Sequence, residues 1–162
     1  MRRIAIAFLL ACATLAAPTA ARAATSNTAT LTEFRTPDGW YYATDPSEIA
    51  AAQRQYALTE RRDVAEVHNG YSAGAVPIYR LKTTARREYL LTTSSGEVTA
   101  LLDSGHFQYE RILGYISRSP AAGRQELDRM NNGQTWRVTT ASGRAALTAA
   151  GFTLDGPLGY AG

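Results

Sequence analysis

EYLLTTS at residues 88–94 and WRVTTA at residues 136–141 share one phrase: an aromatic residue, two variable residues, two threonines and a small residue. A third version, WYYATD, occupies residues 40–45. Two columns of the phrase align across the three copies: Trp40, Tyr89 and Trp136, and then Thr44, Thr93 and Thr140. Self-similarity at a nearly constant spacing indicates a fold built from repeated units.

An arginine stands upstream of each phrase, and turn-forming residues separate the arginine from the aromatic residue. The arginines are Arg35, Arg80 and Arg129. The intervening residues include TPDG at 36–39 in the first copy and NNG at 131–133 in the third. Short apolar-leaning segments on both sides of such residues predict that each unit begins with a β-hairpin.

A helix start follows each pair of threonines. Residues 45–48, DPSE, combine an N-cap acceptor, a proline at the first helical position and a glutamate, and residues 94–97, SSGE, repeat the capping pattern. In the third copy Arg144 replaces the glutamate, and we expect Ser142 to cap a later start. Glycines that follow the second and third helices predict left-handed helix ends. They are Gly105 and Gly151.

The segment after each helix also repeats, which completes the unit. Four residues of the second copy match four of the third at a constant offset of 45: Phe107, Glu110, Gly114 and Tyr115 with Phe152, Asp155, Gly159 and Tyr160. We therefore expect three strand-strand-helix-strand units at about 31–73, 76–119 and 124–161. They are expected to share one core in a single α+β domain, 31–162, closed around a pseudo-threefold axis because an open arrangement would leave sheet edges unprotected.

The amino terminus predicts export. Residues 1–23 contain two arginines, an apolar run and a small-residue Ala-Arg-Ala end, so we expect a signal peptide cleaved after Ala23 and a secreted or periplasmic protein. Residues 24–30 are small and polar, which predicts a flexible lead-in. Cys12 loosely resembles a lipoprotein cleavage site, but Leu10 is unfavourable beside the cleaved bond, so the sequence favours soluble export over a lipid anchor.

Charge and cysteine content exclude several classes of partner. Without residues 1–23 the chain has 14 basic and 14 acidic residues and no cysteine. This balance gives no basic footprint for nucleic acid or an anionic membrane, and no disulfide can form. No further transmembrane segment is present in the sequence.

Over residues 31–161 the chain resembles a family of uncharacterised secreted bacterial repeats. The family phrase is roughly Y-R-F-Y, then H-F-Y-T-T-S, a glutamate in the helix start, and E-G with a closing aromatic residue. The second copy carries the match at Tyr79-Arg80, 91–94, Glu97, Glu110 and Gly114-Tyr115, and the first copy at Phe34-Arg35, Tyr42, Thr44 and Glu48. The family histidine is replaced by Trp40, Tyr89 or Trp136, so a role that depends on it is not carried over. The resemblance implies an extracellular module, often joined to hydrolases, with no established activity.

Catalytic and metal-binding patterns are missing from the sequence. His68 and His106 form no ligand pair, and there is no G-x-S-x-G segment, so we predict no catalytic residue, metal or cofactor. Glu110 and Asp155 are the carboxylates that the repeat singles out, and we expect them to form ion pairs with the repeated Arg80 and Arg129.

The repeated aromatic residues are interpreted as core, particularly Trp40 and Trp136. The opposite strand face, which carries Tyr41, Leu90 and Arg137, is mixed and expected to be partly exposed. Aromatic rings on rigid strands can stack on sugars while polar side chains bind hydroxyl groups. The candidate ligand-binding residues are therefore Tyr41, Tyr71, Tyr109 and Arg137.

The leading functional hypothesis is an exported, non-enzymatic module that binds a cell-envelope or extracellular glycan. One alternative is a small secreted hydrolase of glycosidic bonds, which requires two carboxylates in one cleft. The other is a structural or inhibitory protein that acts through a protein partner. The sequence indicates neither the ligand nor the oligomeric state.

Overall fold

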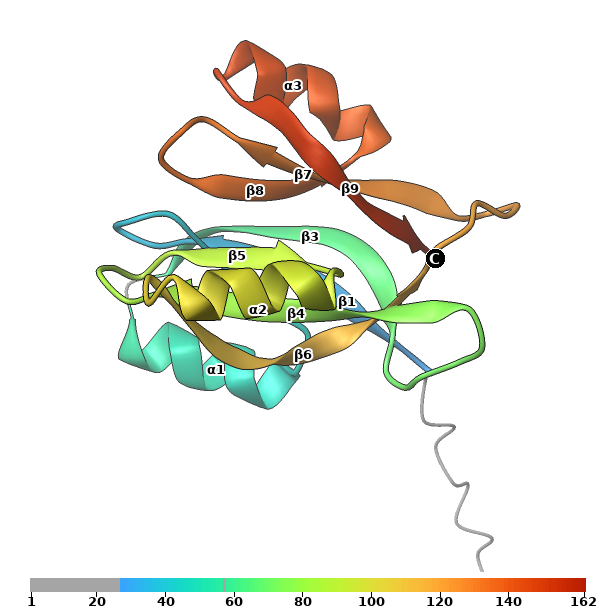
Figure 1. Ribbon diagram of the computed structural model, residues 1–162, viewed down its shortest axis with the longest axis horizontal. Coiled ribbons are helices and arrows are strands. Elements are labelled where there is room, and N and C mark those ends of the chain that lie inside the picture. The colour runs from blue at the N-terminus through green and yellow to red at the C-terminus, as the bar shows by residue number, and fades with distance from the viewer. Residues whose placement is uncertain (1–26, 57) are drawn as a thin grey trace, which may run out of the picture.

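The computed structural model describes residues 27–56 and 58–162 (Figure 1). The expected signal peptide at 1–23 and Cys12 lie outside the described residues. The first strand already begins at Thr28, three residues before the expected start of the domain.

Strands and helices follow one another in the order strand, strand, helix, strand three times. The first unit contains β1 (Thr28–Arg35), β2 (Trp40–Ala43), α1 (Pro46–Gln55) and β3 (Thr59–His68). The second contains β4 (Ala75–Thr83), β5 (Tyr89–Thr92), α2 (Ser95–Asp103) and β6 (Phe107–Ser117). The third contains β7 (Gln125–Asn131), β8 (Trp136–Thr140), the 3-10 turn η1 (Ala141–Gly143), α3 (Arg144–Ala149) and β9 (Thr153–Ala161).

All strand pairings are antiparallel and join the strands into one nine-stranded sheet. The main path is β2-β1-β3-β6-β9-β7-β8, and β4 pairs with both β5 and β6. Adjacent units are linked by single residue pairs, His68 with Tyr115 and Ser117 with Tyr160. The helices lie on the outside of the strands (Figure 1).

The expected α+β fold closed around a pseudo-threefold axis is wrong: the protein is mainly β, and its sheet is open, with a path that ends at β2 and β8. The expectation assumed that exposed edges must be paired with other strands. Instead, one carbonyl on each of β2, β5 and β8 accepts a hydrogen bond from an arginine side chain. These carbonyls belong to Tyr42, Leu91 and Val138. Covering an edge with side chains protects it without closure.

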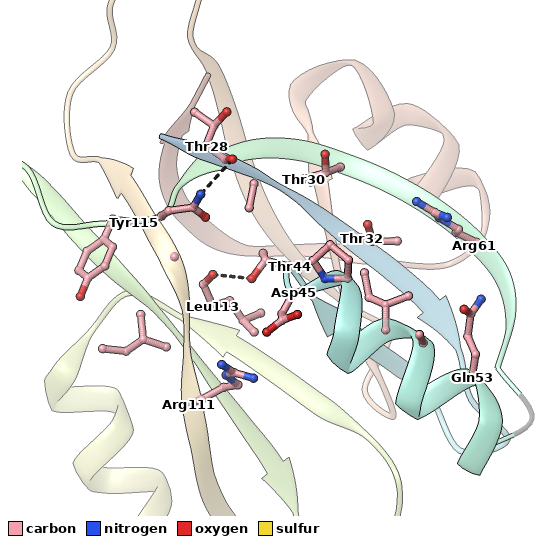
Figure 2. Close-up of a pocket in the computed structure, with 17 residues that line it drawn as sticks. Thr28, Thr30, Thr32, Thr44, Asp45, Gln53, Arg61, Arg111, Leu113 and Tyr115 are labelled. Carbon is pink, nitrogen blue, oxygen red and sulfur yellow. Dashed lines mark hydrogen bonds between the residues drawn. The ribbon is translucent and has the colours of Figure 1, made fainter. Parts of the chain in front are cut away.

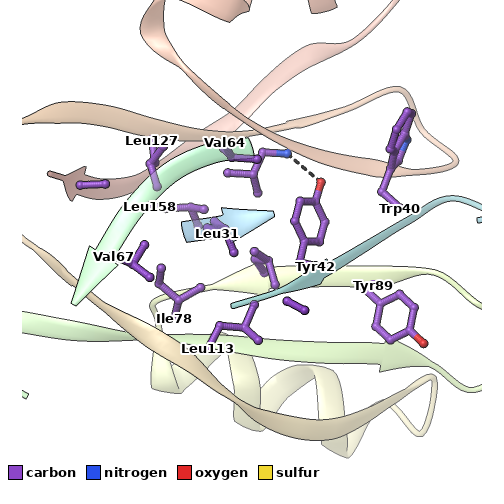
Figure 3. Packing of buried hydrophobic residues seen from close by; sticks show 14 of the residues in the cluster. Leu31, Trp40, Tyr42, Val64, Val67, Ile78, Tyr89, Leu113, Leu127 and Leu158 are labelled. Atoms are coloured by element: carbon purple, nitrogen blue, oxygen red, sulfur yellow. Dashed lines mark hydrogen bonds between the residues drawn. The ribbon is translucent and has the colours of Figure 1, made fainter. Parts of the chain in front are cut away.

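One hydrophobic core joins the three units (Figure 3). Leu31, Ile78 and Leu127 occupy corresponding positions on the first strand of each unit, and all three are 0% exposed. Tyr42 fixes the first unit to the third, because its hydroxyl donates to Glu33 (2.7 Å) and accepts from the backbone N–H of Val138 (3.0 Å). A unit of this size cannot form such a core by itself.

Helix starts and ends follow the local signals. The Asp45 carboxylate accepts from the backbone N–H groups of Ser47 and Glu48, and the Ser94 hydroxyl accepts from that of Glu97. The third helix starts late, at Arg144, but no side chain caps it, so the expected Ser142 cap is wrong. Gly105 and Gly151 adopt the predicted left-handed conformation, with φ of 72° and 86°.

The three hairpin turns meet at one end of the sheet. The Thr36 hydroxyl donates to the carbonyl of Arg87 (2.7 Å), and the Arg87 backbone N–H donates to Asp38 (3.0 Å). Arg86 of the second turn donates to the carbonyl of Gln134 in the third. The turns therefore hold one another through side chains.

Glu88 is buried among these turns with its carboxylate incompletely satisfied. Its side chain is 0% exposed, and neither oxygen accepts an aligned hydrogen bond from any residue that the structure describes, although Arg86 Nη2 lies 2.5 Å from Oε2. Burial raises the pKa of Glu88 above its usual value of 4.5, and the charge of Arg86 offsets only part of this.

Glu88→Gln is expected to stabilise the protein at pH 7. A carboxyl group whose pKa is raised by folding favours the folded state below its unfolded pKa, and this contribution is lost as the pH rises through the folded pKa. The melting temperature of the variant should therefore exceed that of the parent at pH 7, and the difference should vanish below pH 4.5. Glu60→Gln, at an exposed position, is the control. A less stable Glu88→Gln variant at pH 7 would show that the Arg86 contact outweighs burial.

Candidate functional site

The units are joined by arginine side chains that occupy one register position. Arg80 lies opposite Leu91 in its hairpin, and Arg129 lies opposite Val138. The corresponding residue of the first unit, opposite Tyr42, is Glu33. The alignment that placed Arg35 in this column is therefore wrong. Glu33 and Arg129 both precede the aromatic residue of their hairpin by seven residues, whereas Arg80 precedes Tyr89 by nine, so spacing from the aromatic residue indicates this position in two of the three units.

Arg80 joins the first unit to the second. Its guanidinium donates to Glu48 of α1 (2.6 Å), to Glu110 of its own unit (2.7 Å) and to the carbonyl of Tyr42. The side chain is only 5% exposed, and it lies over the ring of Tyr41 at 4.8 Å. Burial opposes ionisation of Glu48, but the hydrogen bond from Arg80 and its charge hold the pKa of Glu48 below its usual value.

Arg129 repeats this arrangement between the second and third units. It donates to Glu97 of α2 through both terminal nitrogens (2.9 and 2.8 Å), to Asp155 (2.6 Å) and to the carbonyl of Leu91 (3.1 Å). The predicted ion pairs Arg80–Glu110 and Arg129–Asp155 are thus present. The role of Glu97 was not predicted from the sequence, because a glutamate in a helix start is normally interpreted as a local cap.

The charges are reversed in the first unit. Glu33 is fully buried and accepts hydrogen bonds from Arg137 of β8 (2.5 Å) and Arg62 of β3 (2.9 Å). Burial alone would raise the pKa of Glu33, but the hydrogen bonds and charges of Arg137 and Arg62 outweigh it and lower the pKa. Arg62 also donates to the carbonyl of Val138 (2.6 Å), so the third unit is held against the first.

Two of the candidate ligand-binding residues form part of these junctions. Tyr41 is 4% exposed, donates to Glu48 (2.8 Å) and lies edge-on to Tyr89 at 5.0 Å. Arg137 is 17% exposed and lies 3.5 Å above the ring of Trp40. The expectation that this strand face is partly exposed is wrong for Tyr41 and for Leu90, which is 2% exposed, because the next unit covers the face.

The first two repeated threonines attach their helix start to the closing strand, the last strand, of the next unit. Thr44 Oγ1 donates to the carbonyl of Leu113 (2.7 Å), and Thr93 Oγ1 donates to that of Leu158 (2.9 Å). Thr140 differs, since its hydroxyl bonds to that of Ser142 (2.9 Å). The Thr44–Leu113 and Thr93–Leu158 contacts each lie in a groove between a helix start and the closing strand of the next unit.

The first groove lies between β1, α1 and β6 and has a volume of about 940 Å³ (Figure 2). Four residues of β1 line it, the alternating threonines Thr28, Thr30 and Thr32 and the small Ala29 between them. Gln53 and Arg61 lie at one end, and Tyr115 lies at the other. Such a groove combines hydroxyl, amide and guanidinium groups with one aromatic ring.

Arg111 lies on the β6 side of the first groove in a fixed position. Its Nη1 atom donates to Glu48 Oε2 at 2.7 Å, while the other carboxylate oxygen of Glu48 binds Arg80. The side chain remains 46% exposed. The junction between the units therefore positions a cation at the groove.

The second groove lies between α2 and β9 and has a volume of about 540 Å³. Its lining includes Tyr79 of β4, Arg118 after β6, and Tyr160 of β9. The start of α2 contributes Ser94 and Ser95.

The two exposed candidate tyrosines each lie beside a groove. Tyr71 is 72% exposed and lies edge-on to Tyr115 of the first groove, at 6.1 Å between ring centres. Tyr109 is 45% exposed and lies edge-on to Tyr79 of the second groove, at 6.4 Å. Tyr115 and Tyr160 were not predicted to be groove residues, although both belong to the repeated Leu-Gly-Tyr tripeptide.

Several kinds of site are missing from the described part of the chain. Across residues 27–56 and 58–162, no three His, Cys, Asp or Glu side chains gather closely enough to hold a metal ion. Among the helices that the structure describes, none has the length and apolar character needed to cross a bilayer.

Comparison with known proteins gives a family but no function. No curated protein and no solved structure matches the chain. A family profile matches residues 36–162. This range includes the lining of both grooves except for the residues of β1, and it includes all three arginine junctions except for Glu33. The chain therefore belongs to the family DUF5648, described as a domain of unknown function.

Proposed function

We propose that this protein is an exported, non-catalytic module that binds a cell-envelope or extracellular glycan in the first groove. The observation that carries the proposal is the composition of that groove: threonine hydroxyls, the Gln53 amide and two arginines, with an aromatic pair at one end. Small-ligand sites typically occupy several hundred Å³ and combine apolar surface with a few placed polar groups. The first groove has this size and composition.

The polar groups suit a neutral or weakly acidic sugar. Sugar hydroxyls both donate and accept, so a lining of hydroxyl and amide groups can pair with them in either direction. Arg111 adds a donor whose position is fixed by Glu48, which reduces the entropy lost when a ligand binds. The rings of Tyr115 and Tyr71 offer apolar surface with a polar hydroxyl tip, as sugar faces require.

The hydrolase alternative lost the carboxylates on which it depended. Glu110 and Asp155 are each bound by the arginine of their own unit, at 2.7 and 2.6 Å. A general acid or nucleophile must instead be directed at a ligand. The arrangement supports the proposed non-catalytic role.

The distribution of exposed apolar side chains also supports a glycan over a protein partner. Four large apolar residues are exposed in the described chain, and they lie on four different segments: Tyr71, Leu102, Tyr109 and Leu154. Protein interfaces are centred on a contiguous buried patch.

A binding assay with purified protein tests the proposal. The probes are insoluble peptidoglycan, chitin and cellulose, together with soluble tetrasaccharides of each, measured by co-sedimentation and calorimetry. Tyr115→Ala and Tyr71→Ala should each weaken binding roughly tenfold, equivalent to about 1.4 kcal/mol, because each removes stacking surface. Leu154→Ala, which removes an exposed side chain outside the groove, should leave the affinity unchanged.

Two results would contradict the proposal. Folded protein, verified by circular dichroism, that binds none of the probes would exclude these glycans as ligands. Equal binding by the parent and the Tyr115→Ala variant would show that a bound glycan lies elsewhere on the protein.

A further inference from the structure

We infer that the second groove is a second site for the same class of glycan, so that one chain binds a repeating polysaccharide at two points. This inference rests on the proposed function. Its basis is that the two grooves are built from corresponding residues held by corresponding contacts.

Corresponding segments enclose both grooves. One wall is the residue after each second strand and the helix start, at 44–46 in the first groove and 93–95 in the second. The facing wall is a Leu-Gly-Tyr tripeptide of the next unit, at 113–115 and 158–160. The two grooves thus arise at the same place in two consecutive units.

The same interactions set the separation of the walls. A threonine hydroxyl donates to the leucine carbonyl in each groove, at 2.7 Å for Thr44 and 2.9 Å for Thr93. Behind the walls, Arg80 and Arg129 each bind the helix glutamate and the edge carbonyl of the preceding unit. Contacts equivalent to those of the first groove therefore set the width of the second groove.

Each groove also has a pair of tyrosines of which one is exposed. In the first groove Tyr115 lies edge-on to the exposed Tyr71, and in the second Tyr79 lies edge-on to the exposed Tyr109. The pairs come from different positions in the two units, so the repeat alone does not account for both. Tyr160 adds a further ring to the second groove, at the position of Tyr115 in the first.

Arg118 provides the second groove with a donor for a ligand. It is exposed, and within the described residues its guanidinium makes no hydrogen bond or ion pair, although its backbone N–H donates to Gly74 (3.3 Å). It stands where the first groove has Asn69. Each of these residues directly follows the residue that pairs with the groove tyrosine, His68 with Tyr115 and Ser117 with Tyr160. A guanidinium in place of an amide offers hydrogen bonds to hydroxyls and a charge for acidic sugar units.

Two sites on one domain raise the apparent affinity for a polymer more than the affinity for its short fragments. Once one groove holds a segment, binding of the other becomes intramolecular wherever the chain can reach it, so the apparent affinity rises with polymer length. The second groove is smaller, at about 540 Å³ against about 940 Å³, and we expect it to hold a shorter segment.

Calorimetry with the soluble tetrasaccharides of peptidoglycan, chitin and cellulose tests the inference. The tetrasaccharide that binds should do so at two sites per chain. Tyr160→Ala and Arg118→Ala should each weaken binding at the second groove at least tenfold and leave the first groove unchanged. Tyr115→Ala should weaken binding at the first groove roughly tenfold and leave the second groove unchanged. Arg54→Ala, an exposed arginine on α1 outside both grooves, is the matched control for Arg118→Ala and should retain both sites.

The outcomes separate this inference from the proposed function. Binding at one site per chain that Tyr115→Ala weakens and the Tyr160 and Arg118 variants leave unchanged would overturn the second site and support the first. Absence of binding by folded protein would overturn both. Two sites that respond to neither groove's variants would also overturn both assignments.

Discussion

Arg80→Ala is expected to lower the free energy of unfolding by about 3–5 kcal/mol, as is typical when one partner of a buried ion pair is removed. The variant leaves Glu48 and Glu110 without their shared cation, and it leaves the edge carbonyl of Tyr42 without a donor. It also removes the cation above the ring of Tyr41. Urea unfolding followed by tryptophan fluorescence measures the change.

Arg61→Ala is the matched control for Arg80→Ala. Arg61 pairs with Asp63 at 3.4 Å, but both side chains are more than half exposed, so this pair should contribute less than about 1 kcal/mol. Arg80→Lys should fall between the two, because lysine keeps the charge but cannot reach both carboxylates and the carbonyl in a fixed plane. Equal stability of the Arg80→Ala and Arg61→Ala variants would show that the junction does not hold the units together.

Gly159→Ala is expected to destabilise the protein by about 2–5 kcal/mol, through overpacking and backbone strain together. Its φ is 141°, a conformation that residues with a side chain rarely adopt, and a Cβ atom there would lie 2.6 Å from the carbonyl oxygen of Ser117. That oxygen belongs to the backbone of β6 and cannot rotate away. Strands β6 and β9 can approach this closely because Gly159 has no side chain.

Two other glycines calibrate this prediction. Gly114→Ala should destabilise by about 1–3 kcal/mol, since its Cβ would meet Val67 Cγ2 at 2.7 Å and the carbonyl oxygen of His68 at 2.9 Å, but its backbone is not in the left-handed region. Gly156→Ala, on the same strand as Gly159, has open space around the added atom and should change stability by less than about 0.5 kcal/mol. If all three variants unfolded at the same urea concentration, close strand approach would not explain the repeated glycine.

Local features of this fold could be predicted from the sequence. Helix starts at Asp45 and Ser94 and left-handed ends at Gly105 and Gly151 depend on residues within one turn, so short patterns identify them. The ion pair between Arg80 and Glu110 could also be predicted, because both residues belong to the repeat.

Features that depend on the next unit could not be predicted in this way. Glu48 has the spacing of a local cap, yet its partners are Arg80 and Arg111, 32 and 63 residues away. Tyr41 lies on a strand face that a single unit would expose, and it is buried only because the second unit covers it. Closure was inferred from edge protection, and arginine side chains provide that protection instead.

The direction of the arginine contacts has a consequence for synthesis. A ribosome releases the amino-terminal unit first, yet the glutamates of α1 and α2 are each neutralised by an arginine of the following unit, and buried Glu33 needs Arg137 from the last hairpin. In contrast, Arg144 of α3 pairs with Glu126 within its own unit. The first unit therefore lacks the partners of its buried charges until the last hairpin has been synthesised. We expect the chain to fold in one late step and not unit by unit.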